Sequence, residues 1–256
     1  MKRFENAIAL ITGAGSGIGE ATAKRLASEG ARVILVGRTV SKLEKVASEI
    51  NNSRNSQVAF PFACDVTSEK EVENLTDYVE KEFGDVTVLV NNAGGLFNST
   101  IQQTSYEDWE EIQRLNLNSV FLVSKRIGKV MMDSSSKNPN VDRSIINVAS
   151  LSGHKPGALF PHYSAAKASV INLTRAMAFE YSRNGIRVNS VSPGFVETSL
   201  VDAENEKLLK IVKKKTTMNR IGQPEEIANV IAFLSSKEAS YVTGTDMLVD
   251  GGFMLT

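Results

Sequence analysis

The feature that most constrains the fold is the repeated alternation of short, continuous apolar runs with amphipathic stretches. Runs rich in Val, Ile and Leu occupy Ala7–Thr12, Arg32–Gly37, Val58–Ala63, Val86–Val90, Ser144–Ala149, Arg187–Val191 and Met247–Val249. Such runs, without polar alternation, are typical of strands buried on both faces of a parallel sheet. Helical patterns lie between them at Ile18–Ser28, Ser41–Asn51, Ser68–Phe83, Tyr106–Met132, Tyr163–Asn184 and Pro224–Ser235. The alternation predicts an α/β fold, a doubly wound, Rossmann-type, mostly parallel sheet with helices on both faces.

Residues typical of helix starts and ends fit these boundaries. Serines stand at three expected helix starts and glycines just past three expected ends, namely Ser41, Ser68, Ser105, Gly30, Gly84 and Gly185. No low-complexity linker divides the chain, so a single domain over residues 1–256 is expected. The polar stretch Asp133–Arg143 is interpreted as a surface loop, and an insertion at about 195–219 is expected to cover the substrate site.

Composition narrows the class of protein. The chain has 256 residues, 42% of them hydrophobic, with Lys+Arg 29 and Asp+Glu 29, so its formal charge is zero. A neutral chain lacks the bulk positive field that attracts nucleic acid or anionic lipid, and neither partner is expected. One cysteine, Cys64, and two histidines, His154 and His162, are too few for a disulfide or a four-ligand zinc site, so no metal is expected. No apolar run reaches the ~18 residues of a membrane span, and Ala7–Ile11 is too short for a signal peptide, which predicts a cytoplasmic protein.

A glycine-rich loop joins the first apolar run to the first helical pattern. It reads Thr12-Gly13-Ala14-Gly15-Ser16-Gly17-Ile18-Gly19, a T-G-x-x-x-G-x-G spacing. Glycine lets the backbone approach a ligand closely, and a helix N-terminus offers N–H groups to a phosphate. The cofactor contacts expected here are Gly13, Gly15, Ser16, Gly17, Ile18 and Gly19. A turn without a ligand is the alternative interpretation.

The end of the second apolar run bears on the choice of dinucleotide. A site for NAD usually places an acid there, about 20 residues after the glycines, against the ribose 2′-hydroxyl. This chain has Arg38 after Val36-Gly37 instead. A guanidinium can bind a 2′-phosphate through two hydrogen bonds. Arg38 therefore favours NADP, with NAD as the alternative, unless it is only a solvated side chain at a strand end.

Further short motifs follow in a fixed order along the chain. They are Asp65-Val66, Asn91-Asn92-Ala93-Gly94, Asn116, Ser150, Tyr163 with Lys167, Pro193-Gly194 with Thr198, and Val249-Asp250-Gly251-Gly252. Together with the glycine loop, these residues resemble the short-chain dehydrogenase/reductase family in its shorter, single-domain branch. The resemblance covers nearly the whole chain, and 3-oxoacyl-carrier-protein reductases are the subgroup closest in appearance.

The resemblance implies a catalytic group of Asn116, Ser150, Tyr163 and Lys167. Tyr163 looks like the general acid that protonates a carbonyl oxygen, or the base in the reverse direction. Moving a phenol from a pKa of ~10 towards ~7 needs about 4 kcal/mol of preferential phenolate stabilisation. Lys167, four residues on and on the same helix face, is expected to supply that charge. Ser150 would hold the substrate oxygen, and Asn116 would kink its helix and support a water relay.

The resemblance also implies a cofactor role for residues that follow successive strands. Asp65 and Val66 resemble the pair that contacts adenine, and the stretch Asn92, Ala93 and Gly94 would run beside the ribose. The family's lysine, Lys167, also binds ribose hydroxyls, and Tyr163 stands at the nicotinamide. The turn that grips the carboxamide would comprise Pro193, Gly194, Val196 and Thr198.

These features favour an NADP-dependent oxidoreductase that interconverts a small ketone and a secondary alcohol. An apolar pocket is expected from Leu96, Phe97, Leu159, Phe160, Phe195 and Leu200. A 3-oxoacyl-carrier-protein or 3-oxoacyl-CoA reductase is the alternative. This alternative is weakened by Phe179, because those enzymes usually carry a basic residue at that position. It is supported if the lysines at 207, 210, 213, 214 and 215 bind the anionic tail of such a substrate. The other interpretation of these lysines is a solvated helix face.

Three other classes of function are weighed against this oxidoreductase. A non-catalytic dinucleotide sensor would tend to lose the Tyr163–Lys167 pair, and a purely structural protein would bind no nucleotide. A serine hydrolase that uses His162 and Ser150 is the third alternative, but the chain lacks the G-x-S-x-G elbow of such enzymes.

The resemblance further implies a homotetramer, in which helices Tyr106–Met132 and Tyr163–Asn184 pair across a two-fold axis and the apolar ending Phe253-Met254-Leu255 packs on a neighbour.

Overall fold

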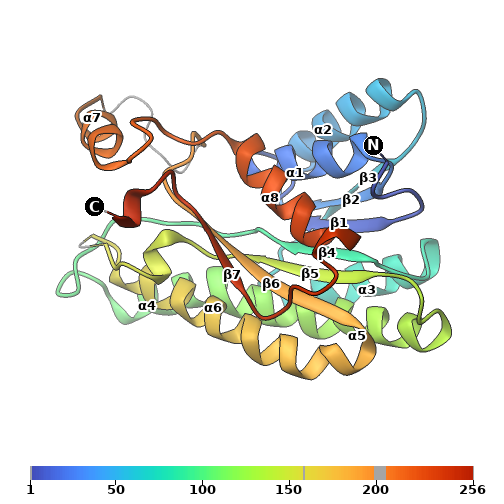
Figure 1. The fold of residues 1–256 in the computed structure, drawn as a ribbon. Coiled ribbons are helices and arrows are strands. Elements are labelled where there is room, and N and C mark those ends of the chain that lie inside the picture. The colour runs from blue at the N-terminus through green and yellow to red at the C-terminus, as the bar shows by residue number, and fades with distance from the viewer. Residues whose placement is uncertain (1, 158, 199–205, 256) are drawn as a thin grey trace.

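A computed structural model describes residues 2–157, 159–198 and 206–255. Its centre is one seven-stranded sheet in the order β3-β2-β1-β4-β5-β6-β7, with every neighbouring pair parallel (Figure 1). The strands are β1 (Ile8–Thr12), β2 (Arg32–Gly37), β3 (Ala59–Ala63), β4 (Val88–Asn91), β5 (Arg143–Val148), β6 (Ile186–Pro193) and β7 (Asp246–Val249). The sheet confirms the doubly wound α/β class that the apolar runs predicted.

Helices cover both faces of this sheet. They are α1 (Gly17–Ser28), α2 (Val40–Arg54), α3 (Glu69–Glu82), α4 (Tyr106–Gln113), α5 (Ser119–Lys137), α6 (Pro161–Tyr181), α7 (Glu206–Lys215) and α8 (Pro224–Ser235). Figure 1 shows α1, α2 and α8 on one side and α3, α5 and α6 on the other. Alternate residues of β1 supply the two cores: Ala9 and Ile11 pack with the first group, and Leu10 with the second. Burial on both faces explains why the strands carry no polar alternation.

The strand order reverses direction next to β1. Chain order runs outward from β1 to β2 and β3 on one side, and from β4 to β7 on the other. In an open parallel sheet, ligands bind beyond the carboxyl ends of the strands at such a switch point. The fold therefore places the binding crevice after Thr12 of β1 and Asn91 of β4.

The helix expected over Tyr106–Met132 is interrupted and longer than predicted. A π-helical turn, Arg114–Asn118, separates α4 from α5, and α5 continues to Lys137. The loop expected at Asp133–Arg143 is therefore wrong over its first half. Buried Ser134 and Ser135 donate hydrogen bonds to the carbonyl oxygens of Gly84 (3.1 Å) and Asn184 (2.6 Å), so these polar side chains anchor the last turns of the helix instead of ending it.

Helix capping follows the sequence at two of the three predicted serines. Ser68 and Ser105 accept hydrogen bonds from the backbone N–H groups of Glu71 and Asp108 at the starts of α3 and α4. The prediction for Ser41 is wrong, because α2 begins at Val40. None of the helices in the described ranges is long and apolar enough to cross a membrane.

Candidate active site

Two cavities adjoin at the carboxyl ends of the strands and share Gly94 in their walls. The smaller, of about 190 Å³, lies over β1, β2 and β3 and is here termed the nucleotide cavity. The larger, of about 600 Å³, lies over β4, β5 and β6 and is termed the substrate cavity. Together they form the crevice expected at the switch point, and nearly all of the residues singled out in the sequence line one or the other.

The glycine loop forms one wall of the nucleotide cavity. Gly13, Gly15 and Ser16 line it, and the first turn of α1 begins directly after them. Gly13 has φ +66°, and a Cβ there would stand 2.8 Å from Asn92 Nδ2, so only glycine fits without strain. The Ser16 side chain makes no capping hydrogen bond to α1. The N–H groups of the first helical turn are thus left for another acceptor, such as a phosphate.

Two glycines of the motif, Gly17 and Gly19, line neither cavity. At Gly19, a Cβ would stand 2.2 Å from the carbonyl oxygen of Gly13. Gly19 therefore lets α1 pack against the loop. Gly17 has φ +55°, and a Cβ there would stand 3.2 Å from Thr198 Cγ2, so this residue brings the loop against the segment after β6.

The far end of the nucleotide cavity is basic. Arg38, exposed at the end of β2, lines it together with Lys42 of α2 and with Asp65 and Val66 after β3. Thr67 donates both its backbone N–H and its hydroxyl to Asp65 Oδ1, at 2.9 and 2.8 Å. Burial raises the pKa of Asp65, but these bonds, with help from Arg38, bring it below its ordinary value. Lys42, which lies in the first turn of α2 and four residues after Arg38, was not foreseen from the sequence.

The residues Ser150, Tyr163 and Lys167 meet in the substrate cavity. Ser150 follows β5, whereas Tyr163 and Lys167 stand one turn apart on α6. The Ser150 side chain lies close enough to the Tyr163 hydroxyl to favour the ionised form of the phenol and lower its pKa. The Lys167 side chain crosses the Tyr163 ring, with Nζ 5.6 Å from the ring centroid, and donates to the carbonyl oxygen of Val148 at 2.8 Å. Lys167 is only 4% exposed, so its charge faces the cavity and not bulk water.

The ionisation of this pair differs from the expectation in one respect. Burial lowers the pKa of Lys167 to about 8. Burial also raises the pKa of Tyr163 above its ordinary value, and the nearby Ser150 side chain offsets only part of that rise. The predicted shift of the phenol towards neutrality is thus not found in the protein alone, because Lys167 points its ammonium at a carbonyl and faces the aromatic ring, not the hydroxyl. The phenol is held protonated, as a proton donor requires.

Asn116 lies inside the π-helical turn and is fully buried. Its amide donates to the carbonyl oxygens of Gly95 (2.9 Å) and Ile112 (3.1 Å), and its Oδ1 accepts from the Gly95 N–H at 3.2 Å. A Cβ on Gly94 would stand 2.7 Å from Asn116 Oδ1 and 3.6 Å from Lys167 Nζ. Asn116 thus fixes the chain after β4 against the lysine, and the expected interruption of its helix is present.

The end of β6 and the segment after it line the other side of the substrate cavity. Pro193, Gly194, Val196 and Thr198 line it, as do Ile18 and Asn92 from the opposite wall. Ala93 lines the nucleotide cavity.

The apolar wall was only partly foreseen. Leu96, Leu159, Phe160 and Phe195 line the substrate cavity. Phe97 does not, because its ring packs on His162 with centroids 4.8 Å apart. Leu200 lies outside the described residues. Phe253, expected at a subunit contact, lines the cavity here and packs on Phe195 at 5.3 Å. Nothing in the local sequence reveals this, since 58 residues separate the two rings in the chain.

His162 is fully buried, and neither ring nitrogen has a hydrogen-bond partner among the described residues. Burial lowers the pKa of this imidazole. Its ring packs on Phe97, and it does not line the substrate cavity, whereas Ser150 does. This geometry gives no support to a serine-hydrolase interpretation.

The crevice has the features that a nicotinamide dinucleotide needs. Glycines line the wall where a phosphate would approach α1, basic side chains stand beyond β2, and a buried lysine and a phenol stand at the opposite end. The two cavities share Gly94 in their walls, where a side chain would clash with Asn116. These residues fit the cofactor implied by the sequence.

Comparison with known proteins is consistent with this site. Residues 13–254 match a family model described as enoyl-(acyl carrier protein) reductase. The chain is 38% identical to an uncharacterised oxidoreductase of Bacillus subtilis, over 99% of this chain and 93% of that protein. It is 35% identical to meso-2,3-butanediol dehydrogenase of Serratia marcescens (98% and 95% covered) and 36% identical to a 3-oxoacyl-carrier-protein reductase of Vibrio cholerae (98% and 99%).

Among solved structures, a short-chain type dehydrogenase/reductase from Mycobacterium marinum superposes with a TM-score of 0.92. It is 35% identical, and the match covers 99% of this chain and 97% of that one. The likeness therefore extends over both cavities and the whole sheet.

Proposed function

Because this chain belongs to the short-chain dehydrogenase/reductase family, whose members are oxidoreductases that use nicotinamide dinucleotides, we propose that it interconverts a ketone and a secondary alcohol, with Tyr163 as the acid and base. The observation that carries the proposal is the convergence of Ser150, Tyr163 and the buried Lys167 on one cavity. When bound, the dinucleotide would supply or accept the hydride at the carbon of the reacting C–O bond.

The protein's own residues handle the proton and the oxygen. Ser150, at the end of β5, donates a hydrogen bond to the substrate oxygen and stabilises the charge that develops on it. Tyr163 gives its phenolic proton to that oxygen during reduction and takes one back during oxidation. Its raised pKa in the protein keeps it protonated before reduction. Lys167, whose ammonium lies beside the ring but does not by itself lower the pKa of the phenol, would stabilise the phenolate left behind together with the positively charged nicotinamide of the oxidised dinucleotide.

Asn116 acts by positioning. Two of its hydrogen bonds hold the backbone of Gly95, next to Gly94, where a Cβ would stand 3.6 Å from Lys167 Nζ. A relay that returns protons from solvent to Lys167 would start at this π-helical turn, as the family resemblance implies.

The acid/base role is tested by Tyr163→Phe. Loss of the phenolic proton is expected to lower kcat about 10²- to 10⁴-fold, while dinucleotide affinity by fluorescence titration changes little. Tyr241→Phe is the matched control, since Tyr241 is fully exposed and far from both cavities. Turnover that survives in the Tyr163 variant refutes the assignment.

The cofactor is NADP, on the strength of the basic end of the nucleotide cavity. Arg38 and Lys42 line it, and no acid follows β2 to bind a ribose 2′-hydroxyl. Arg38→Ser is expected to lower kcat/KM for NADPH about tenfold or more, since charged hydrogen bonds contribute roughly 1.5–3 kcal/mol, and to leave that for NADH nearly unchanged. Lys45→Ser, an exposed lysine outside the cavity wall, serves as control. A wild-type preference for NADH of tenfold would refute the choice.

A 3-oxoacyl thioester reductase is the second candidate, favoured by the 36% identity to a 3-oxoacyl-carrier-protein reductase. Phe179, 76% exposed on α6, stands where a basic residue would dock an acidic carrier. A dinucleotide sensor remains the contrast of another class. It predicts cofactor binding without turnover across a broad panel of ketones.

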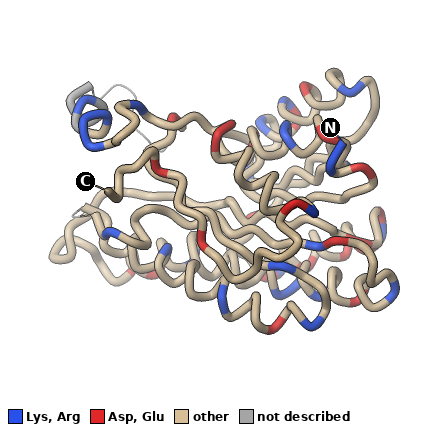
Figure 2. The backbone as a smooth tube through the Cα atoms, viewed as in Figure 1, with Lys and Arg blue, Asp and Glu red and all other residues tan. Residues whose placement is uncertain are grey.

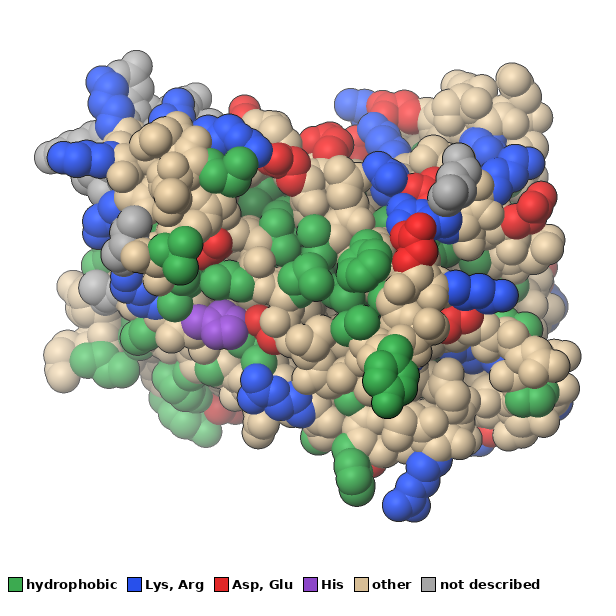
Figure 3. All heavy atoms as spheres, in the orientation of Figure 1, with side chains coloured by type: hydrophobic (Ala, Val, Ile, Leu, Met, Phe, Trp, Pro, Cys, Tyr) green, Lys and Arg blue, Asp and Glu red, His purple; other side chains and the backbone are tan. Residues whose placement is uncertain are grey.

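The protein is a cytoplasmic homotetramer in this proposal. Apolar residues are exposed on the helices that would pair, including Tyr106 of α4, Phe121 of α5 and Phe179 of α6. Figure 3 shows hydrophobic side chains gathered across the face that carries the edge strand β7, which would form a second contact between subunits. Sedimentation at micromolar concentration tests the state, and a monomer would contradict it.

A further inference from the structure

The sheet carries a single acidic side chain within its seven strands, all of which the structure describes. This residue is Asp246, at the start of β7. Figure 2 shows that charged residues otherwise lie mostly on the helices and loops around the sheet. The Asp246 side chain is only 4% exposed. Burying a carboxylate is costly unless donors satisfy its oxygens, so its hydrogen-bond partners show what holds it there.

Three side chains donate to this carboxylate. The hydroxyls of Ser190 and Ser192 on β6 donate to Oδ1 of Asp246, the second of them at 3.0 Å. His154 Nε2 lies 2.7 Å from Oδ2. Since a carboxylate only accepts hydrogen bonds, Nε2 carries the proton in this contact. The strand β6 thus fixes the carboxylate of Asp246, and the carboxylate fixes the imidazole of His154.

His154 belongs to the turn that carries Ser150. The Ser150 carbonyl oxygen accepts from the Gly153 N–H at 2.9 Å, and its hydroxyl oxygen accepts from the Ser152 N–H at 3.1 Å. The His154 N–H donates to the carbonyl oxygen of Leu151 at 3.0 Å. These bonds join the turn into one unit, so the direction of the Ser150 hydroxyl depends on where the turn lies.

The same turn packs on α6. A Cβ on Gly153 would stand 3.0 Å from the carbonyl carbon of Lys167. Glycine at this position therefore lets the turn reach the helix that carries Tyr163 and Lys167. The turn is held by two elements, by α6 through this close approach and by β7 through the contact of His154 with Asp246.

The pair stands outside the walls of the site. Ser150 and Ser152 line the substrate cavity, whereas His154 and Asp246 line neither that cavity nor the nucleotide cavity. Any effect of the pair on the reaction must therefore pass through the turn.

We propose that His154 and Asp246 are positioning residues of the reaction. Their hydrogen bond holds the turn of Ser150 against α6 and so sets the place of the Ser150 hydroxyl relative to that of Tyr163 at the substrate carbonyl. The inference rests on the proposed function and adds to it a pair that no motif of the sequence indicates, since 92 positions separate the two residues in the chain. Precise placement matters because a displacement of about 1 Å at reacting groups can lower a rate about 100-fold.

The kinetics of His154→Ala test the pair. The probes are cyclohexanone, 2-octanone, 2,3-butanedione and the N-acetylcysteamine thioester of acetoacetate, and the one that wild type reduces fastest is used. The single-turnover rate of reduction, which product release does not mask, is expected to fall about 10- to 100-fold. The KM for the probe and the Kd for the dinucleotide should change little, because His154 lines neither cavity.

Two further variants separate positioning from general stability. His154→Gln keeps a side-chain N–H donor, and it is expected to retain most of the wild-type rate. Asp246→Ala removes the acceptor and should be as slow as His154→Ala. The two losses should not add in the double variant, because each single substitution already removes the same bond.

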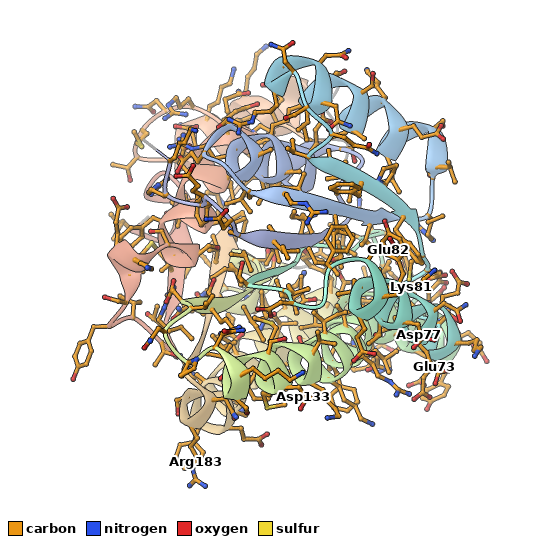
Figure 4. All side chains as sticks on the ribbon, turned by 90° about the vertical axis from the view of Figure 1, so that its right-hand side faces the viewer. Glu73, Asp77, Lys81, Glu82, Asp133 and Arg183 are labelled. Atoms are coloured by element: carbon orange, nitrogen blue, oxygen red, sulfur yellow. The ribbon has the colours of Figure 1, made fainter. Side chains whose placement is uncertain are left out.

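Lys129→Ala is the matched control. It removes an ion pair with Asp133 whose length is also 2.7 Å, at an exposed place on α5. Figure 4 labels Asp133 on this helix. The rate of this variant should equal that of wild type.

The other outcomes overturn the inference. A His154→Ala variant that is less stable but keeps the wild-type rate would make the pair merely structural, and a higher KM at an unchanged rate would assign it to binding. A His154→Gln variant as slow as His154→Ala, or losses that add in the double variant, would likewise contradict a role of the bond. Each of these results leaves the proposed function standing, whereas absence of turnover by wild type with every probe refutes both.

Discussion

The buried ammonium of Lys167 offers the sharpest test of the site, because it should weaken the fold that holds it. Below pH 8 the amine is charged in both the folded and the unfolded chain, and the full cost of burying it is present. Between its folded pKa of about 8 and its ordinary value of 10.5, the folded protein releases the proton while the unfolded chain keeps it. The cost therefore disappears as the pH rises through this window.

The magnitude follows from that shift. A difference of about two and a half pH units, at about 1.4 kcal/mol each, corresponds to about 3 kcal/mol of destabilisation at pH 7. Replacement by methionine removes this cost but also removes the hydrogen bond to the Val148 carbonyl, worth about 1 kcal/mol. Lys167→Met is thus expected to be more stable than wild type by about 2 kcal/mol at pH 7, and to be inactive.

Urea denaturation of the cofactor-free protein at pH 7 and pH 10, at one protein concentration, measures this. The advantage of the variant should vanish or reverse at pH 10. Lys213→Met, at an exposed position of α7, should show no such dependence on pH. A variant less stable than wild type by the same amount at both pH values would show that the amine is not desolvated, and the reasoning from burial would be wrong.

Two further predictions concern stability. In Gly19→Ala the new Cβ would stand 2.2 Å from the Gly13 carbonyl oxygen, so the free energy of unfolding should fall by roughly 1–3 kcal/mol. The affinity for the cofactor should fall with it. Gly222→Ala is the control, because the nearest atom to its Cβ would be 3.6 Å away, and thermal denaturation should show almost no change. Glu29→Gln weakens the charge pairing with Arg3 (2.8 Å), which is the main reason that the pKa of Glu29 is lowered. This substitution should lower the free energy of unfolding by about 2 kcal/mol at pH 7. The difference from wild type should disappear as the pH falls through the pKa of Glu29 in the folded protein. A difference that is the same at acidic pH would contradict the role of the ion pair.

Local patterns predicted most of the fold. Short apolar runs between amphipathic stretches predict buried parallel strands. Ser68 and Ser105 mark helix starts because their hydroxyls accept hydrogen bonds from nearby backbone N–H groups. The errors fall where distant parts of the chain intervene. Ser134 and Ser135 look like loop residues, but carbonyls of two other loops turn them into helix anchors.

For the site, the sequence alone determined the chemical groups. The glycine spacing, Arg38 and the Tyr163–Lys167 interval identify a nucleotide crevice and a phenol–amine pair, since each depends on residues close together in the chain. Only the tertiary structure decided the electrostatics: that burial lowers the pKa of Lys167 yet raises that of Tyr163, and that His154 meets the buried carboxylate of Asp246. Desolvation and charge depend on what packs around a group in three dimensions, and contacts between distant segments supply that packing.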